Sequence, residues 1–123
     1  MAPDEPRAGD EALVYWVTAT LPDAEVAGEY LTWLEAGHLA EVVRGGARSA
    51  ELIILDSEGM GDTRIRVVSR YVFSDRAAFA EYERTHAPRL RAEGVARFGP
   101  SRGERAVQFA RSVGARRLML ASP

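Results

Sequence analysis

Apolar and β-branched residues dominate the first patterned segment of the chain. Residues 12–20, ALVYWVTAT, contain no glycine or proline, which is typical of a β-strand. Side chains alternate between the two faces of a strand. One face carries Leu13, Tyr15 and Val17, and the other carries Val14, Trp16 and Thr18. A strand that is apolar on both faces is expected to be central, with both faces covered.

A helical pattern follows over residues 24–43, with Asp23 placed to cap its N-terminus. Its apolar and aromatic residues recur at the spacing of a single helical face: Val26, Tyr30, Trp33, Leu34 and His38. Gly37 is expected to bend or divide this helix just before His38. Gly45 and Gly46 are expected to end it.

The rest of the pattern predicts a hairpin, a broken helix and a final strand. Strands are expected over 50–55 and about 64–73, joined by the turn-rich loop 56–62. Ser74 and Asp75 are placed to begin a second helix, which carries Ala78, Phe79 and Tyr82 inward and breaks near Ala87 and Pro88. Further helical turns are expected over about 89–98, and the last strand over about 105–113.

The order β-α-β-β-α-β predicts an α+β domain with the ferredoxin-like fold, a four-stranded antiparallel sheet with two helices on one face. We expect it to span 12–113, between a disordered leader over 1–11 and a tail over 114–123. Two helices cover only one face of the sheet, whereas the first strand is apolar on both. The uncovered face therefore predicts a homodimer in which a second copy covers it.

The composition excludes several kinds of chemistry. The 123 residues contain no cysteine, lysine or asparagine, and all 16 basic residues are arginine. Disulfides, thiolate nucleophiles and lysine Schiff bases are therefore absent. No apolar run approaches the roughly 20 residues of a membrane span, and the acidic start of the chain lacks the apolar stretch of a secretory signal. No membrane partner is expected, and the location is expected to be cytoplasmic.

Charge is distributed unevenly along the chain. Residues 1–62 contain three arginines and thirteen acidic residues, and residues 63–123 contain thirteen arginines and five acidic residues. In a fold whose halves interleave, these charges neutralise one another within the domain or across a dimer. The net charge of −2 disfavours a nucleic-acid partner. The predicted strand over 64–71 also lacks the glycine and alternating aromatic residues of an RNA-recognition motif.

Two runs of sequence resemble a known family. The run 33–42, WLEAGHLAEV, with Gly45 and Gly46 after it, resembles the first-helix signature of a family of short bacterial proteins described as a domain of unknown function. The run 70–91, RYVFSDRAAFAEYERTHAPRLR, continuing to Gly99, resembles its second signature. With the first strand, the resemblance covers about residues 12–112.

This family resembles the dimeric α+β barrel superfamily, which includes cofactor-free monooxygenases, muconolactone-type isomerases, polyketide cyclases and haem-degrading enzymes. The passage from Tyr71 to Tyr82 is similar to the matching stretch of the antibiotic-biosynthesis monooxygenases. The resemblance implies a dimeric barrel. The asparagine used by haem-degrading members is missing, because the chain has none, and no cofactor is expected.

His38 and His86 are the only histidines and the candidate catalytic residues. The ordinary pKa of histidine, about 6.5, suits proton transfer near neutrality. If the two helices pack side by side, both imidazoles approach one cavity. The alternative is that each imidazole binds a backbone group at a helix break. A metal site formed by His38, Glu41 and His86 has suitable ligand types, but its spacing is common on solvated helices, and no metal is expected.

Aromatic residues and arginines supply the candidate ligand-binding residues. These are Trp16, Trp33, Arg70, Tyr71 and Tyr82, with Tyr15 and Arg66 as further members of the two groups. Arg66 and Arg70 share a strand face and are suited to bind a carboxylate or enolate, or to form an exposed or inter-subunit ion pair. Aromatic stripes more often form a core than a pocket.

Two functions remain open from sequence. The first is a dimeric barrel that binds a small apolar or aromatic molecule, with cofactor-free acid–base chemistry of the isomerase, cyclase or monooxygenase type. The alternative is a non-catalytic dimeric interaction or ligand-sensing module, in which the histidines are structural. The position of the histidines relative to a cavity distinguishes the two.

Overall fold

A computed structural model describes residues 12–56 and 63–117 of the chain. Its sheet has four antiparallel strands in the order β2-β3-β1-β4. The strands are β1 (Leu13–Leu21), β2 (Ser49–Leu55), β3 (Ile65–Phe73) and β4 (Gln108–Ala115). β1 lies between β3 and β4, so the strand that is apolar on both faces is central. This confirms the predicted ferredoxin-like sheet.

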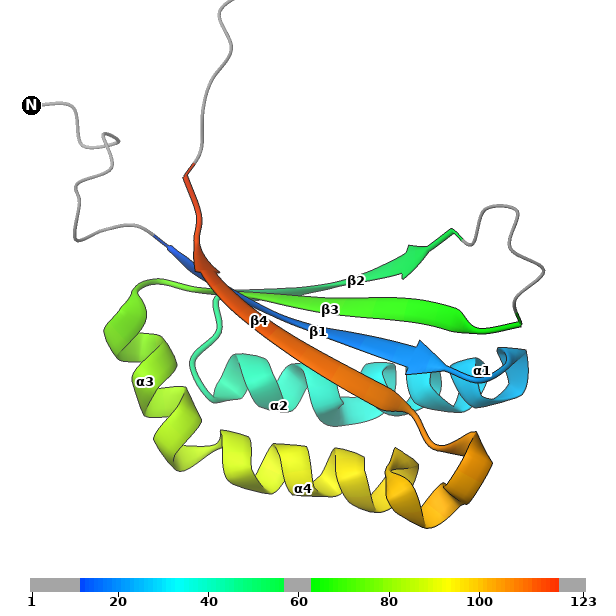
Figure 1. Cartoon of the computed structure of the whole chain (residues 1–123). Coiled ribbons are helices and arrows are strands. Elements are labelled where there is room, and N and C mark those ends of the chain that lie inside the picture. Colours follow the sequence, from blue (N-terminus) through cyan, green and yellow to red (C-terminus); the bar gives the residue numbers. More distant parts are fainter. Residues whose placement is uncertain (1–11, 57–62, 118–123) are drawn as a thin grey trace, which may run out of the picture.

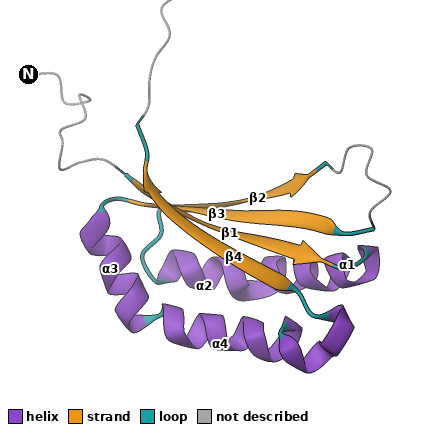
Figure 2. Cartoon of the chain, viewed as in Figure 1, coloured by secondary structure: helices purple, strands orange, loops and turns teal. Residues whose placement is uncertain are grey.

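The helices cover one face of the sheet only, as Figures 1 and 2 show. They are α1 (Ala24–Trp33), the π-helical turn η1 (Leu34–His38), α2 (Leu39–Arg44), α3 (Arg76–Thr85), α4 (Ala87–Phe98) and the 3-10 helix η2 (Pro100–Arg105). The predicted leader 1–11, most of the predicted tail 114–123 and residues 57–62 of the predicted loop lie outside the described residues.

Predicted capping residues fix where the helices begin. Asp23 Oδ1 accepts a hydrogen bond from the Val26 amide at 2.9 Å, and Asp75 Oδ1 accepts one from the Ala78 amide at 2.8 Å. Pro88 lies in the first turn of α4, where its missing N–H costs nothing. Asp23 and Asp75 thus satisfy amide groups that a helix leaves free at its N-terminus.

The last strand begins later than the sequence pattern suggests. We expected it from about Arg105, but Pro100–Arg105 forms η2 and β4 begins at Gln108. Gly103 allows this local coil because its φ is +62°, a conformation that favours glycine. β4 continues to Ala115, and the Arg116 amide still donates to the Ala12 carbonyl at 2.8 Å.

The core lies between the sheet and the helices. Its buried side chains come from alternate positions of the strands and from the inner faces of the helices, and include Leu13, Tyr71, Phe73, Tyr82 and Phe98. β1 and β3 are in register, with Tyr15 opposite Tyr71 and Leu13 opposite Phe73. Residues two apart on each strand therefore share this helix-covered face.

The opposite surface of the sheet, which we call the outer face, carries no helix in the described residues (Figure 2). Its members are Val14, Trp16, Thr18 and Thr20 of β1, Ser49, Glu51, Ile53 and Leu55 of β2, Arg66, Val68, Arg70 and Val72 of β3, and Gln108, Ala110, Ser112 and Gly114 of β4. Val14 and Val72 are buried, whereas Ile53 and Leu55 are exposed.

Ion pairs join the acidic first half of the chain to the basic second half. Arg102 pairs with Glu29 at 2.8 Å, and Arg89 with Glu41 at 3.2 Å. Arg70 of β3 pairs with Glu51 at 2.7 Å, directly across the β2–β3 ladder. The charge asymmetry is thus partly neutralised within the domain, as expected for interleaved halves.

Gly45 marks a close approach of α2 to α3, and a substitution there has a predictable cost. A Cβ atom at this position would lie 3.0 Å from Tyr82 Cδ1 and 3.1 Å from His86 Cγ. We expect Gly45→Ala to lower the free energy of unfolding by about 1–3 kcal/mol, because the buried Tyr82 ring has to move. Urea denaturation measures the change.

The control for this variant is Gly28→Ala, on the exposed side of α1, where a Cβ meets nothing within 4 Å. This change is expected to raise the free energy of unfolding by up to about 1 kcal/mol, because alanine favours a helix over glycine. A Gly45→Ala protein as stable as the wild type would contradict the close contact.

Candidate functional site

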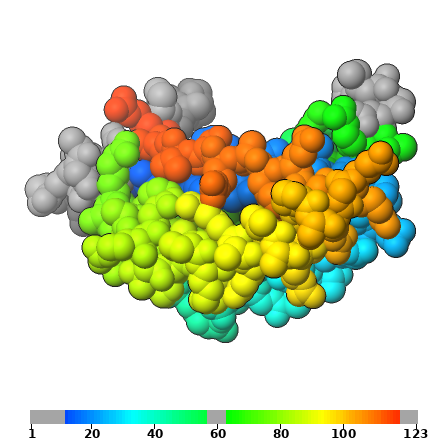
Figure 3. All heavy atoms as spheres, turned by 60° about the horizontal axis from the view of Figure 1, so that its bottom comes forward, coloured from blue at the N-terminus to red at the C-terminus, as the bar shows by residue number. Residues whose placement is uncertain are grey.

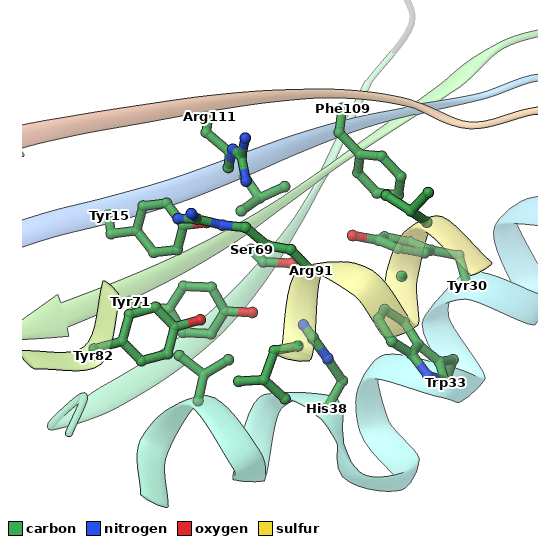
Figure 4. Close-up of a pocket in the computed structure, with 15 residues that line it drawn as sticks. Tyr15, Tyr30, Trp33, His38, Ser69, Tyr71, Tyr82, Arg91, Phe109 and Arg111 are labelled. Carbon is green, nitrogen blue, oxygen red and sulfur yellow. The ribbon is translucent and has the colours of Figure 1, made fainter. Parts of the chain in front are cut away.

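A cavity of about 160 Å³ lies between the sheet and the helices. Side chains from every strand except β2, and from every α-helix and η1, line it: Tyr15, Val17, Tyr30, Trp33, His38, Val42, Ser69, Tyr71, Tyr82, Leu90, Arg91, Gly94, Val95, Phe109 and Arg111. Figure 4 shows the aromatic rings, His38 and the two arginines around the same space. An apolar cavity of about 150 Å³ suffices to bind benzene.

The mouth of this cavity lies between β4 and α4. In the space-filling view, atoms of β1 are visible through the gap between these two elements (Figure 3). Phe109 is 37% exposed and Val95 is 52% exposed, and both line the cavity from the two sides of the gap. The opening is therefore bordered by apolar side chains, as in a site for an aromatic or apolar molecule.

The π-helical turn η1 places His38 in the cavity. The His38 ring stacks on the Trp33 ring, with centroids 4.1 Å apart and an interplanar angle of 25°. In an α-helix, side chains five residues apart point in different directions, but the wider π-helical turn brings them nearer to one side. Gly37 has non-helical backbone angles within this turn. The predicted division of the helix just before His38 is confirmed.

His38 is half-buried, and its Nδ1 atom is fully buried and unsatisfied. Its Nδ1 has no hydrogen-bond partner among the described residues, and it does not cap α2. Burial lowers the pKa of His38 below its ordinary 6.5, and Arg89 lowers it further, whereas Glu93 and Glu41 raise it. The expected backbone contact of this histidine is thus not formed, and the ring is held neutral near pH 7.

Protonated phenols and a hydroxyl face the same space. Burial raises the pKa of Tyr30 to about 12, and also raises the pKa of Tyr71 and Tyr82 above the ordinary value of 10. Ser69 is 1% exposed, and its Oγ has no hydrogen-bond partner of good geometry among the described residues. It nevertheless lies close enough to Tyr30 and Tyr71 to offset part of the rise in their pKa. These groups remain hydrogen-bond donors at neutral pH.

Five of the predicted site residues meet in the cavity. His38, Trp33, Tyr71, Tyr82 and Tyr15 all line it. His86 does not: its ring packs against Tyr82, at 6.4 Å between centroids, and it makes no side-chain cap to α4. The two histidines therefore do not share a cavity.

The prediction that Trp16 and Arg70 belong with the other ligand-binding residues is corrected by the structure. They are cross-strand partners on the outer face, whereas their neighbours Tyr15 and Tyr71 point to the helices. The reason is the alternation of side chains along a strand. Arg70 is paired with Glu51 on that face.

Several lining residues were not singled out from sequence. Ser69 is the one small polar residue on the helix-covered face of β3, among aliphatic and aromatic side chains, a signal that the alternation pattern contained. Phe109 and Arg111 lie two apart on β4 and therefore share a face. Arg91 of α4 reaches the Tyr15 hydroxyl at 3.4 Å, and only the packing of α4 against the sheet reveals this contact.

Glu41, which the alternative metal site would require, is bound by arginines. Its carboxylate accepts hydrogen bonds from Arg44 at 2.8 Å and from Arg89 at 3.2 Å. Within residues 12–56 and 63–117, no group of three or more acidic or histidine side chains is arranged to hold a metal ion.

The sequence of the domain that carries the cavity matches one protein family. Residues 12–111, which include β1, the cavity lining and the first half of β4, match the model described as Domain of unknown function (DUF4286). The chain belongs to this family. A search of curated proteins finds no match. The resemblance stated from the two sequence signatures is thereby confirmed.

Solved structures similar to this DUF4286 family member share its fold. A dimeric ferredoxin-like protein from an uncultured marine organism is 17% identical, with a TM-score of 0.56 over 89% of this chain and 99% of the other. A proposed antibiotic biosynthesis monooxygenase from Bacillus cereus is 10% identical, with a TM-score of 0.58 over 91% and 99%. SnoaB, a cofactor-independent oxygenase from Streptomyces nogalater, is 14% identical, with a TM-score of 0.54 over 91% and 99%.

At these identities the likeness establishes the fold alone. The chain has the ferredoxin-like α+β architecture found in dimeric α+β barrels. None of the helices in its described part is long and apolar enough to cross a membrane.

The lowered pKa of His38 has a measurable consequence for stability. Between pH 6.5 and the lower pKa of the folded state, the unfolded chain binds a proton at His38 that the folded protein excludes. The free energy of unfolding is therefore expected to fall as pH drops below about 6.5. Urea denaturation at several pH values measures this.

Comparison with His38→Gln isolates the contribution of this group, since the variant cannot take up the proton. The pH dependence below about 6.5 is expected to be shallower in the variant than in the wild type. Equal slopes in the two proteins would contradict the burial of a neutral His38.

Proposed function

We propose that the cavity binds a small apolar or aromatic molecule and that His38 transfers a proton to or from it without a cofactor. The observation that carries this proposal is the buried Nδ1 of His38, without a partner among the described residues, in a cavity of aromatic rings and protonated hydroxyls. Unsatisfied buried polar atoms are rare and need an explanation. A bound molecule that exchanges a proton with His38 supplies one.

The chemistry follows from the protonation states. A neutral imidazole accepts a proton from an acidic C–H or O–H group of the bound molecule, and returns it at another position or to the product. The hydroxyls of Tyr30, Tyr71 and Ser69 remain donors, so they stabilise the negative oxygen that forms when the proton leaves. Enclosure between sheet and helices keeps water away and strengthens these interactions.

These roles suit isomerisation, cyclisation or cofactor-independent oxygenation, since each begins with removal of a proton. SnoaB, a structure with the same fold, is described as a cofactor-independent oxygenase. The likeness of fold adds plausibility to this reaction class and does not by itself assign it. His86, which lies outside the cavity lining, has no role in this proposal.

We further propose that the chain is a homodimer joined through the outer face. Trp16 and Val68 are half-buried there, and Ile53 and Leu55 are 40% and 41% exposed, so this face presents apolar surface that no helix of the described residues covers. A second copy presents the same apolar surface and completes an isologous interface. A solved structure of the same fold is described as a dimeric ferredoxin-like protein, which supports the pairing of two copies.

Blocking the mouth tests the site. Val95 is 52% exposed at the opening, so a larger side chain there has room outside the core. We expect Val95→Trp to weaken binding of cinnamate, a small planar aromatic probe, by about tenfold or more, because the indole occupies the entrance. Isothermal titration calorimetry measures the affinity.

The matched control is Ala96→Trp, one residue further along α4 on its exposed side and outside the cavity lining. This variant is expected to bind cinnamate as the wild type does. Equal affinities for cinnamate in Val95→Trp and the wild type would contradict a ligand site in this cavity. A protein that binds cinnamate but moves no proton would instead fit the ligand-sensing alternative.

A further inference from the structure

The charged side chains that line the cavity are both arginines. Arg91 of α4 and Arg111 of β4 line the cavity, and no aspartate or glutamate of the described residues is among the lining side chains. Figure 4 shows the two guanidinium groups approaching each other beside Tyr15. Burial raises the pKa of Tyr82, and both arginines oppose that rise, which places each of them within electrostatic reach of the same phenol.

The two arginines differ in what they already bind. Arg91 forms a two-point ion pair with Glu83, at 2.9 and 2.6 Å, and one of its nitrogens also reaches the Tyr15 hydroxyl at 3.4 Å. Its guanidinium carbon lies 5.8 Å from the centre of the Tyr15 ring. Glu83 therefore compensates one of the two positive charges and fixes Arg91 in place.

Arg111 has no carboxylate partner among the described residues, and it projects from an exposed edge strand into the mouth. The Nε of Arg91 is likewise buried without a hydrogen-bond partner in this part of the chain. Two guanidinium groups with a single carboxylate leave a net positive charge at the mouth. This charge, next to unused donor groups, favours a negatively charged oxygen.

We propose that the molecule bound in the cavity is a planar aromatic carboxylate, with its ring among the aromatic side chains and its carboxylate between Arg91 and Arg111. The inference rests on the proposed function and names the class of molecule that the site takes. The ring enters between Trp33, Tyr71 and Phe109, and the carboxylate stays at the opening. The charge thus orients the ring toward His38.

The arrangement also explains why the arginines lie at the mouth of the cavity and not at its inner end. A carboxylate buried beside Tyr71 and Ser69 would lose its hydration without gaining a cation. At the mouth it keeps part of its hydration and gains two planar donors. The apolar interior then holds the part of the molecule that carries the reacting carbon.

The test compares cinnamate with cinnamamide, which has the same shape and no charge, by isothermal titration calorimetry at pH 7. We expect the wild type to bind cinnamate about tenfold more tightly than cinnamamide. In Arg111→Gln the two affinities are expected to become similar, through loss of cinnamate binding with that of cinnamamide unchanged. Arg111→Lys is expected to keep part of the preference, because it keeps the charge but not the planar fork.

Arg66→Gln is the matched control, because Arg66, a candidate ligand-binding residue from sequence, lies exposed on the outer face and outside the cavity lining. This variant is expected to keep the full preference for cinnamate. Equal binding of the two probes to the wild type, or an unchanged preference in Arg111→Gln, would overturn this inference and leave the proposed function standing. Failure of both probes to bind would contradict the proposed function itself.

Discussion

Replacing His38 with glutamine is expected to lower protein-dependent proton exchange about 100-fold or more. A suitable probe is 2-indanone, an aromatic ketone whose CH₂ groups exchange for deuterium when a base removes their protons. A positioned general base typically contributes about 10²- to 10⁴-fold to such a step. Glutamine keeps a polar side chain near Trp33 but cannot accept a proton, so the chemistry is removed with little change of shape.

The rate is measured by the loss of the CH₂ signal in proton NMR in deuterated buffer, with and without protein. His86→Gln is the matched control, because His86 is the second histidine of the chain and lies outside the cavity lining. We expect this control to exchange 2-indanone at the wild-type rate. An equal rate in His38→Gln, or a loss in His86→Gln alone, would contradict the assignment of His38 as the base.

The second large effect concerns the dimer. Val68 lies in the middle of β3 on the outer face, opposite Thr18 of β1 and Ile53 of β2. Val68→Glu buries an unpaired charge in the proposed interface, which costs about 3–5 kcal/mol. The dimer dissociation constant is therefore expected to rise about 150- to 4,000-fold. Sedimentation velocity at micromolar concentration measures the shift from a dimer to a 13.5 kDa species.

Val43→Glu is the control for the dimer, because Val43 is 38% exposed on α2, away from the outer face. It is expected to leave the dimer intact. A wild-type protein that sediments at 13.5 kDa would contradict the dimer itself. The Val68→Glu monomer is expected to bind cinnamate like the wild type, because the cavity lies on the other side of the sheet.

Most of the fold follows from local patterns along the chain. Alternating residues predict β1 and β3, Asp23 and Asp75 cap the helices as expected, and Gly37 divides the helix where predicted. The predicted start of β4 was wrong by about three residues, because the 3-10 helix over Pro100–Arg105 has no strong signal apart from its proline and glycine.

The site was predictable only in part. The helical pattern predicted one stripe with Tyr30, Trp33 and His38, and these three do line one cavity, but His38 meets Trp33 only because of the π-helical turn η1. Spacing along one element says nothing about which strand face meets which helix. For that reason the sequence prediction grouped Trp16 and Arg70, which lie on the outer face, with residues of the helix-covered face. Arg91 and Arg111 converge only because α4 and β4 border the same opening, a tertiary contact without a local signature.

This difference changes the relation between partner and ligand. From sequence, the ligand site and the partner surface are not assigned to different faces of the sheet. The structure separates the two roles: the cavity lies on the helix-covered face, and the apolar surface left for a partner is the outer face. The proposed ligand and the proposed second subunit therefore use opposite sides of one sheet.

The two tryptophans report on these two faces directly. Trp33 lines the cavity, and Trp16 lies on the outer face. Their indole N–H signals in a ¹H–¹⁵N NMR spectrum, assigned with Trp16→Phe and Trp33→Phe, can be followed as cinnamate is added. We predict that the Trp33 signal shifts with saturation while the Trp16 signal stays in place. A shift of the Trp16 signal with Trp33 unmoved would contradict a ligand site on the helix-covered face.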